Sequence, residues 1–272
     1  MGTWTLDDIP WDRFQAGRVD PEVLKLAKAA SVVEHNGRDY ARYLEEVFSD
    51  DPDFRAVACQ WAEEEVQHGQ ALARWAKLAD PNFDFEGAFQ DFAATIKLPE
   101  GVDASVRGSR VGELVARCMV EVGTSSYYSA LMTATDEPVL KEICRRIAAD
   151  EFRHYKMFYD HMKRYLERDG IGFWRRLRIA LSRIAETEDD ELAYAYYATN
   201  HRGEGPYNRK RHWAAYMSGA YRFYRPGHLR LSVAMILKAV GLKLGDWLLA
   251  RVAYVVYLMM RSRSVRLARL AA

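Results

Sequence analysis

Two copies of a Glu-x-x-His motif are the feature of this sequence that points most directly to chemistry. One copy pairs Glu65 with His68, and the other pairs Glu151 with His154. Residues three apart on an α-helix lie about one turn apart on the same face, so the carboxylate and imidazole of each copy could bind one metal ion. A single copy would mean little, because Glu-x-x-His occurs by chance in many helices.

A lone glutamate precedes each motif at nearly the same distance. Glu34 lies 31 residues before the glutamate of the first motif, and Glu121 lies 30 residues before that of the second. Turn signals at 49–52 and 135–138 fall nearly midway between each lone glutamate and the histidine of its motif. Two antiparallel helix pairs would therefore bring all the ligands to one height, which is the pattern of a four-helix di-iron bundle.

Other candidate residues fit this geometry less well. Glu45 is on the same helical stripe as the first lone glutamate, but a rise of about 1.5 Å per residue puts it roughly 16 Å away along the axis. Glu113 misses the second position by a similar amount. We expect Glu63 and Glu64 to be solvated charges beside the true ligand, and His35 to be a surface histidine.

Carboxylates that face one another in a bundle core need a partner, because burying unpaired charges costs several kcal/mol each. Two Fe ions would remove that cost. Hard carboxylates with one imidazole per metal suit Fe, with Mn as the alternative, and the absence of thiolates from the motifs argues against structural zinc. The sequence therefore predicts two Fe ions as the cofactor.

The rest of the chain predicts an all-α protein with a four-helix bundle. Asp-Pro pairs at 20–21 and 51–52 are good helix starts. No β-hairpin, βαβ unit or nucleotide-binding glycine loop is recognisable. The helices expected are 21–48, 52–78, 111–133 and 138–168, with a short helix at 87–96 in the long connection. The division expected is an N-terminal arm at 1–19, the bundle at 20–170 and additional helices at 171–272.

Composition indicates a globular protein of a reducing compartment. The 272 residues are 49% hydrophobic, enough to bury a large core. The three cysteines form no Cys-x-x-Cys pair and fall within helical patterns, so we expect three buried thiols. The sequence has no secretory leader and no run of about eighteen uncharged apolar residues, which predicts a cytoplasmic protein.

The C-terminal part is strongly basic. Residues 205–272 carry 13 Lys and Arg against one acid, Asp246, which leaves 26 basic and 37 acidic residues in the first 204. We expect a fifth helix at 173–196 and an apolar helix, interrupted by Lys and Arg, within 229–260. Such a helix can lie in a membrane interface, present charge to an acidic carrier protein, or pack on the bundle with its basic face solvated. Packing on the bundle is slightly favoured, and 261–269 is expected to be a surface or contact segment.

The residues around the ligands resemble the two iron-binding motifs of the soluble acyl-carrier-protein desaturases of the ferritin-like superfamily. The matching stretches are WxxxExxHG at 61–69 and IAADExRH at 147–154. This resemblance implies a ferritin-like four-helix bundle with a di-iron site. The ligands that it implies are Glu34, Glu65, His68, Glu121, Glu151 and His154.

The resemblance also implies roles for two further residues. Asp150 would be the hydrogen-bond partner of His68, because a ligating imidazole usually donates its other N–H to a carboxylate or carbonyl. Thr124, three residues after Glu121, would form a hydrogen bond near bound oxygen. The alternative for Thr124 is a helix-interior threonine bonded to its own backbone.

By resemblance, the function is that of an O2-dependent di-iron oxidoreductase that desaturates a fatty acyl chain linked to acyl carrier protein or coenzyme A, with electrons from a ferredoxin-type donor. The alternative is a di-iron monooxygenase or hydroxylase acting on a lipid or quinone at the membrane surface. Ferritin- or rubrerythrin-like iron or peroxide handling is less favoured, because no Cys-x-x-Cys pair is present for a rubredoxin iron. We also expect a homodimer, peripheral membrane contact through the basic C-terminus as a further alternative, and no nucleic-acid partner.

Overall fold

The computed structural model describes residues 4–186 and 190–271, and every regular element within them is helical. This confirms the all-α prediction. Three short 3-10 helices come first, η1 (Leu6–Asp8), η2 (Trp11–Arg13) and η3 (Ala16–Arg18). The α-helices that follow are α1 (Pro21–His35), α2 (Gly37–Val47), α3 (Pro52–Ala79), α4 (Phe85–Thr95), α5 (Arg110–Ala134), α6 (Pro138–Asp169), α7 (Phe173–Ala185), α8 (Asp190–Asn200), α9 (Arg209–Arg222), α10 (Pro226–Val240) and α11 (Asp246–Ala271).

Side-chain caps followed by proline determine where three of the long helices begin. Asp20 accepts two backbone hydrogen bonds from the first turn of α1, at 2.8 and 3.1 Å. Asp51 accepts one from α3 at 3.0 Å, and Glu137 accepts one from α6 at 2.8 Å. The proline after each cap needs no N–H partner in the first turn, and its fixed φ suits the helix. The predicted starts at 21, 52 and 138 are confirmed.

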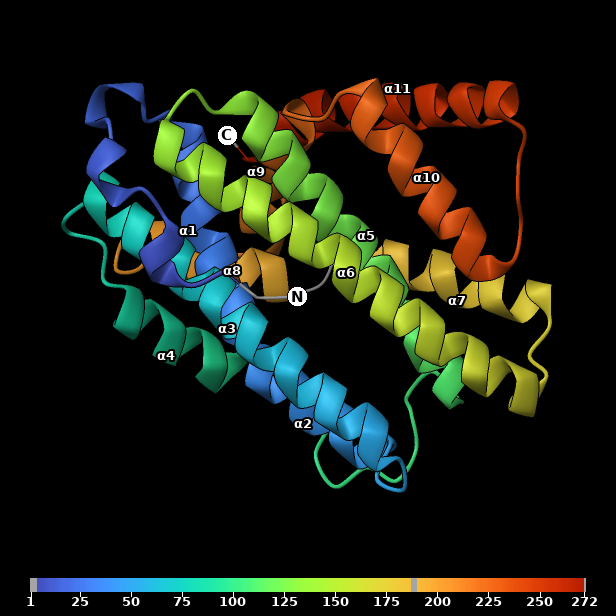
Figure 1. The fold of residues 1–272 in the computed structure, drawn as a ribbon. Helices are drawn as coiled ribbons and strands as arrows, with labels where there is room; N and C mark the ends of the chain where they lie inside the picture. The colour runs from blue at the N-terminus through green and yellow to red at the C-terminus, as the bar shows by residue number, and fades with distance from the viewer. Residues whose placement is uncertain (1–3, 187–189, 272) are drawn as a thin grey trace.

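Two antiparallel helix pairs form the bundle (Figure 1). α1 and α2 lie against α3, α5 lies against α6, and α3 contacts α6 across the middle. The prediction of one helix over 21–48 is wrong, because the helix is interrupted at Asn36, between α1 and α2. A β-carbon at Gly37 would lie 2.6 Å from the Cβ of Glu65, so α2 can pack this closely on α3 only with glycine at the break.

Two apolar clusters fill the bundle on either side of a buried polar layer. One surrounds the C-terminal half of α3 and the N-terminal part of α6, and includes Trp75 and Tyr128. The other surrounds the N-terminal half of α3 and the C-terminal half of α6, and includes Phe158. Between them, the same two helices carry buried charged side chains within 64–68 and 150–154. The apolar clusters thus hold a polar layer at one height in the bundle.

The remaining helices cover the bundle from outside (Figure 1). α8 packs on α1 and α9, α7 and α10 pack on α5, and α11 packs on α9 and α10. The single helix predicted at 173–196 is instead two, α7 and α8, with 187–189 outside the described residues. Among the helices described here, none is both long and apolar enough to cross a membrane.

The three cysteines differ in burial. Cys118 and Cys144 are buried, as predicted, but Cys59 is exposed. Cys59 lies on the outer side of α3, where its thiol donates a hydrogen bond to Glu45 at 2.9 Å. The prediction of three buried thiols is therefore wrong for Cys59, because a helical pattern alone does not tell which side of α3 faces solvent.

Candidate metal centre

The six predicted ligand residues converge in the polar layer between the two helix pairs. Their donor atoms form two overlapping groups, and within each group the atoms lie within 4.8 Å of one another. The groups are Glu34, Glu65, His68 and Glu151, and Glu65, Glu121, Glu151 and His154. Each of the six residues is at most 6% exposed. Glu65 and Glu151 belong to both groups, so these two carboxylates could contribute donors to both of two metal ions.

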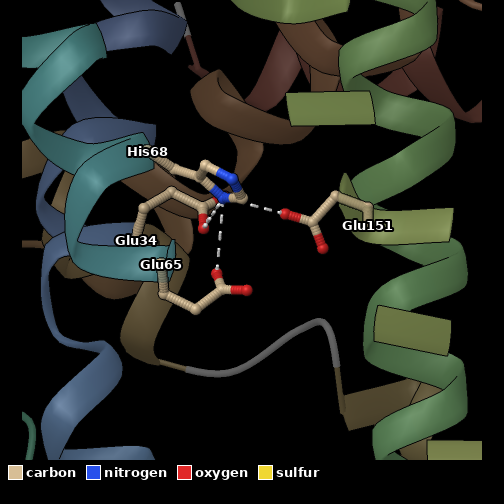
Figure 2. Close-up of side chains that lie close together, drawn as sticks. All are labelled: Glu34, Glu65, His68 and Glu151. Carbon is tan, nitrogen blue, oxygen red and sulfur yellow. Dashed lines mark ion pairs between the residues drawn. The ribbon is translucent and has the colours of Figure 1, made fainter. Parts of the chain in front are cut away.

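The helices bring these side chains together from opposite sides. Figure 2 shows three side chains of the first helix pair facing Glu151, which extends toward them from α6. The Nδ1 atom of His68 lies 3.3 Å from a carboxylate oxygen of Glu151 and 3.9 Å from one of Glu34. In the second group, His154 Nδ1 lies 3.0 Å from Glu65. One nitrogen of each imidazole therefore faces the same centre as the carboxylates.

Close packing of α1 against α3 determines the position of Glu34. A β-carbon at Gly69 would lie 2.6 Å from the backbone nitrogen of His35 and 2.7 Å from the carbonyl oxygen of Ser31. Only glycine fits there without backbone movement, and it directly follows His68 in the chain. The close packing brings Glu34, in the last turn of α1, to the height of the Glu-x-x-His motif on α3.

Buried polar atoms without hydrogen-bond partners mark the centre of this cluster. A buried polar atom without a partner costs about 1–3 kcal/mol, so such atoms are rare in folded proteins. Metal ions would give these atoms partners, and six carboxylate and imidazole donors without a thiolate suit Fe or Mn. The residues present therefore fit a dinuclear metal site. The atoms concerned are Glu65 Oε1, His68 Nδ1, Glu121 Oε1 and Oε2, Glu151 Oε1 and His154 Nδ1.

A carboxylate of the opposite helix pair contacts the Nε2 atom of each histidine. His68 Nε2 lies 3.0 Å from Asp150 Oδ2, and His154 Nε2 lies 2.8 Å from Glu64 Oε2. If each Nε2 carries the proton and donates it to the carboxylate, each Nδ1 is left with a lone pair for a metal ion. Each of these carboxylates directly precedes a glutamate that belongs to both donor groups. Each helix pair therefore orients the imidazole of the other.

Glu64 contacts a histidine of the candidate site, and the sequence interpretation missed it. It is only 7% exposed, and besides His154 it accepts a hydrogen bond from Arg153 at 3.3 Å. The prediction that Glu64 is a solvated charge is therefore wrong, whereas Glu63 is exposed and pairs with Arg38 at 2.8 Å. The sequence does hold a signal, because Glu64 occupies in its motif the position that Asp150 occupies in the other.

Two hydroxyl groups orient the glutamates. Thr124 donates to Glu151 Oε2 at 2.8 Å, and its Oγ1 also lies 3.3 Å from the carbonyl oxygens of Val120 and Glu121, as the backbone-bonded alternative predicts. The role of Thr124 near bound oxygen stays a prediction. The buried Tyr128, which the sequence interpretation missed, donates to Oε1 of Glu34. In each glutamate the second oxygen remains directed toward the cluster.

Burial and mutual repulsion control the charges of the cluster. Burial raises the pKa of Glu34 to about 7. Burial and the charge on Glu151 likewise raise the pKa values of Glu65 and Glu121 well above the ordinary range. Burial opposes ionisation of Glu151 too, but the neighbouring imidazoles of His154 and His68 lower its pKa below the ordinary value. Without metal the four carboxylates thus cannot all ionise easily, and bound cations would remove that repulsion.

The N-terminal arm reaches the buried polar layer through Trp4. Its indole Nε1 donates to Asp150 Oδ2 at 2.8 Å, the same oxygen that contacts His68. The indole and imidazole rings are nearly parallel, with centroids 6.0 Å apart. Arg146 lies over the Trp4 ring at 5.8 Å. Trp11, by contrast, lies beneath Arg74 on the outside of α3.

The residues rejected as ligands lie elsewhere. Glu113 is buried but bonded to Tyr43 at 3.0 Å, and it belongs to neither donor group. Glu45 lies beside Cys59. His35 is half-buried against Phe89, with ring centroids 4.6 Å apart, so the prediction of a surface histidine is only partly correct.

Comparison with known proteins identifies the family. The sequence model of the fatty acid desaturase family matches residues 33–184, more than half of the chain. The chain belongs to the fatty acid desaturase family. All six residues of the two donor groups fall within the matched segment, whereas the N-terminal arm with Trp4 and helices α8 to α11 lie outside it. No curated protein matches this desaturase-family chain.

Proposed function

We propose that this protein is an O2-dependent di-iron oxidoreductase that introduces a double bond into a fatty acyl chain. The observation that carries the proposal is the convergence of six buried carboxylate and imidazole side chains, several of whose buried donor atoms lack hydrogen-bond partners. Membership of the fatty acid desaturase family supports the fatty acyl substrate. Fe is the metal proposed, with Mn as the alternative, because hard oxygen donors with imidazole suit both.

The proposed role of the protein is to hold the metals and to control the charges around them. Two Fe ions bound by the six donors would supply the redox chemistry. Overall, the reaction takes two hydrogens from the acyl chain and reduces one O2 to two waters with two electrons and two protons from outside. Asp150 and Glu64 would keep Nδ1 of each imidazole directed at a metal. Thr124 and Tyr128 would keep Glu151 and Glu34 in fixed rotamers, so that their free oxygens remain available.

An external ferredoxin-type protein is the proposed electron donor. The hydrogen-bonded series Trp4, Asp150 and His68 supports a route, because it joins the N-terminal arm to a proposed ligand through distances of 2.8 and 3.0 Å. Replacing Trp4 by Phe would remove the hydrogen bond but keep the aromatic ring. We expect slower reduction of the bound metals by the donor protein, with their number per chain unchanged, and stopped-flow spectroscopy would measure it.

Turnover with isotopically labelled O2 tests the reaction. Iron-loaded protein would be supplied with reduced ferredoxin and with saturated acyl chains on acyl carrier protein or coenzyme A, and the products analysed by mass spectrometry. Desaturation predicts one O2 consumed per double bond and no label in the lipid. Label in the product would replace the proposal with a hydroxylase, and many irons per chain, rather than about two, would replace it with iron storage.

Variants of the cluster connect the reaction to the site. Glu121→Gln would remove one charged ligand of the second donor group, and we expect loss of product together with weaker binding of one metal. Glu63→Gln, on the same helix as Glu65 but exposed and outside both groups, is the matched control and should keep both metals and full activity. Product formation by metal-free protein would refute the proposal.

A further inference from the structure

The outer face of α11 is an unusual apolar surface. Trp247 is 68% exposed and Met259 is 65% exposed, whereas helices α1 to α6 contain a single exposed large hydrophobic residue, Leu78. Nine of the exposed large hydrophobic side chains lie between 242 and 270. They are Leu242, Trp247, Leu248, Tyr254, Val255, Leu258, Met259, Val265 and Leu270.

The inner face of the same helix is apolar as well. Leu249, Val252, Val256 and Met260 pack against the cluster that Ala253 forms with α10. Residues 247–260 are thus apolar around most of the helix, apart from Arg251. A helix that is apolar all round is normally buried on all sides, yet the described residues cover only one side of this one. The exposed face at 247–259 is therefore apolar, not the solvated basic face expected from the sequence.

Cations lie next to this apolar face. Arg251 lies over the ring of Trp247, 4.7 Å from its centroid. In the second half of the helix a shallow hollow is lined by aliphatic and guanidinium groups together (Leu258, Arg261, Ser262, Val265, Arg266, Arg269). None of the salt bridges between described residues uses these three arginines. Asp246, the single acid after residue 204, already pairs with Arg230 at 3.1 Å.

We propose that the outer face of α11 binds an anionic phospholipid bilayer. Trp247, Leu258 and Met259 would enter the boundary between headgroups and acyl chains. The free guanidinium groups beside them would contact lipid phosphates. Exposed aromatic and aliphatic side chains bordered by arginine are the composition of helices that lie in a membrane interface without crossing it.

The charges on α11 favour an anionic bilayer over a second copy of the chain or an acidic carrier protein. In a symmetric dimer through the same face, each arginine-rich segment would meet a surface whose one carboxylate is already paired, so cations would face cations. An acidic carrier protein would match the arginines but would leave the apolar row from Trp247 to Met259 without a partner. A bilayer with anionic headgroups satisfies both parts of the face.

This inference extends the proposed function without depending on it. The apolar cluster beneath α11 includes Ala130, which belongs to α5, the helix that carries Glu121. The bilayer-bound helix would therefore be separated from a ligand-bearing helix by one layer of packing. Lipid binding can be measured whether or not the protein desaturates an acyl chain, so the two proposals can fail separately.

Vesicle flotation tests the proposal. The full-length protein should float with vesicles of phosphatidylcholine and phosphatidylglycerol, should bind pure phosphatidylcholine vesicles much less, and should be released by salt. Leu258→Glu should weaken binding more than about tenfold, since a buried leucine is worth about 1.5–3 kcal/mol. Leu78→Glu, which changes an exposed leucine of α3, is the control and should bind as the unmodified protein does.

The arginines provide a second, graded measurement. Arg266→Gln and Arg269→Gln should each weaken binding to the phosphatidylglycerol vesicles about fivefold, the equivalent of about 1 kcal/mol per cation near an anionic surface. Circular dichroism and metal content should stay unchanged in all variants, because none of these side chains is buried in the core.

Three outcomes would overturn the proposal. One is equal binding of Leu258→Glu and Leu78→Glu to the anionic vesicles. Another is binding to pure phosphatidylcholine as strong as to the anionic mixture. The third is a stable dimer in solution that Leu258→Glu converts to monomer, with no vesicle binding, which would make a second copy of the chain the partner of α11.

Discussion

Replacing Glu64 by Gln tests whether the carboxylate behind His154 prepares that histidine to bind metal. Glu64 accepts from His154 Nε2 at 2.8 Å and from Arg153 at 3.3 Å, within a site that is almost completely buried. Burial opposes its ionisation, yet the hydrogen bond from His154 holds the pKa of Glu64 below its ordinary value. The Gln side chain has nearly the same size and keeps an acceptor oxygen, but it has no charge.

The expected effect follows from the strength of that hydrogen bond. A hydrogen bond to a charged acceptor contributes about 1.5–3 kcal/mol, and one between neutral groups about 0.5–1.5 kcal/mol. The difference of about 1–2 kcal/mol corresponds to roughly 5- to 30-fold weaker binding of the metal that His154 would hold. Glu64→Ala removes the acceptor completely and should weaken binding by about 10- to 100-fold.

Anaerobic titration with Fe²⁺ against a competing chelator would measure both metal sites. We expect one site to weaken in Glu64→Gln while the site that contains His68 keeps its affinity. Glu63→Gln is the control, because Glu63 is the exposed neighbour in the same helix. An affinity of Glu64→Gln equal to that of the unmodified protein, or an equal loss in Glu63→Gln, would refute the reasoning.

Three further predictions concern pH, thiol reactivity and packing. In metal-free protein, burial raises the pKa of Glu34 to about 7. Burial lowers the pKa of His68, but the facing carboxylates of Asp150 and Glu151 outweigh it and raise that pKa to about 9. The folded state then binds more protons than the unfolded state, so the thermal midpoint should fall as pH rises from about 5 to about 9, and a flat profile would contradict this. In the folded chain only the exposed thiol of Cys59 should react with a disulfide reagent, and all three thiols should react after unfolding. The reaction of Cys59 should be slow, because its hydrogen bond to Glu45 raises the pKa of the thiol. Gly69→Ala should lower the free energy of unfolding by about 1–3 kcal/mol, because the added methyl group would force α1 and α3 apart. Urea denaturation would measure this change, and an unchanged free energy would show that the helices adjust without cost.

The sequence predicted the convergence of the ligand side chains because spacing along a helix determines position. Glu34 and Glu121 could be chosen over Glu45 and Glu113 from axial rise alone, and in the structure the chosen pair joins the donor groups. The starts at Asp20 and Asp51 were equally predictable, because a cap and a following proline act locally.

The features that the sequence did not reveal depend on contacts between distant segments. Glu64 looks like a solvated residue next to a ligand until α6 is placed against α3. The interruption at Asn36 accompanies the close approach of Gly37 to α3, which the periodicity of α1 does not show. Tyr128 reaches Glu34 from 94 residues away in the chain, and no local pattern links such a pair.

Each helix pair provides the carboxylate that orients the histidine of the other pair, so neither pair alone forms a complete half of the site. Asp150 steadies His68 and Glu64 steadies His154, so a fragment that ended in the connection between α3 and α5 would hold a histidine without its orienting acid. Coordination and folding of the two halves should consequently be lost together, and a chain cut in that connection should regain metal binding only when both pieces are mixed.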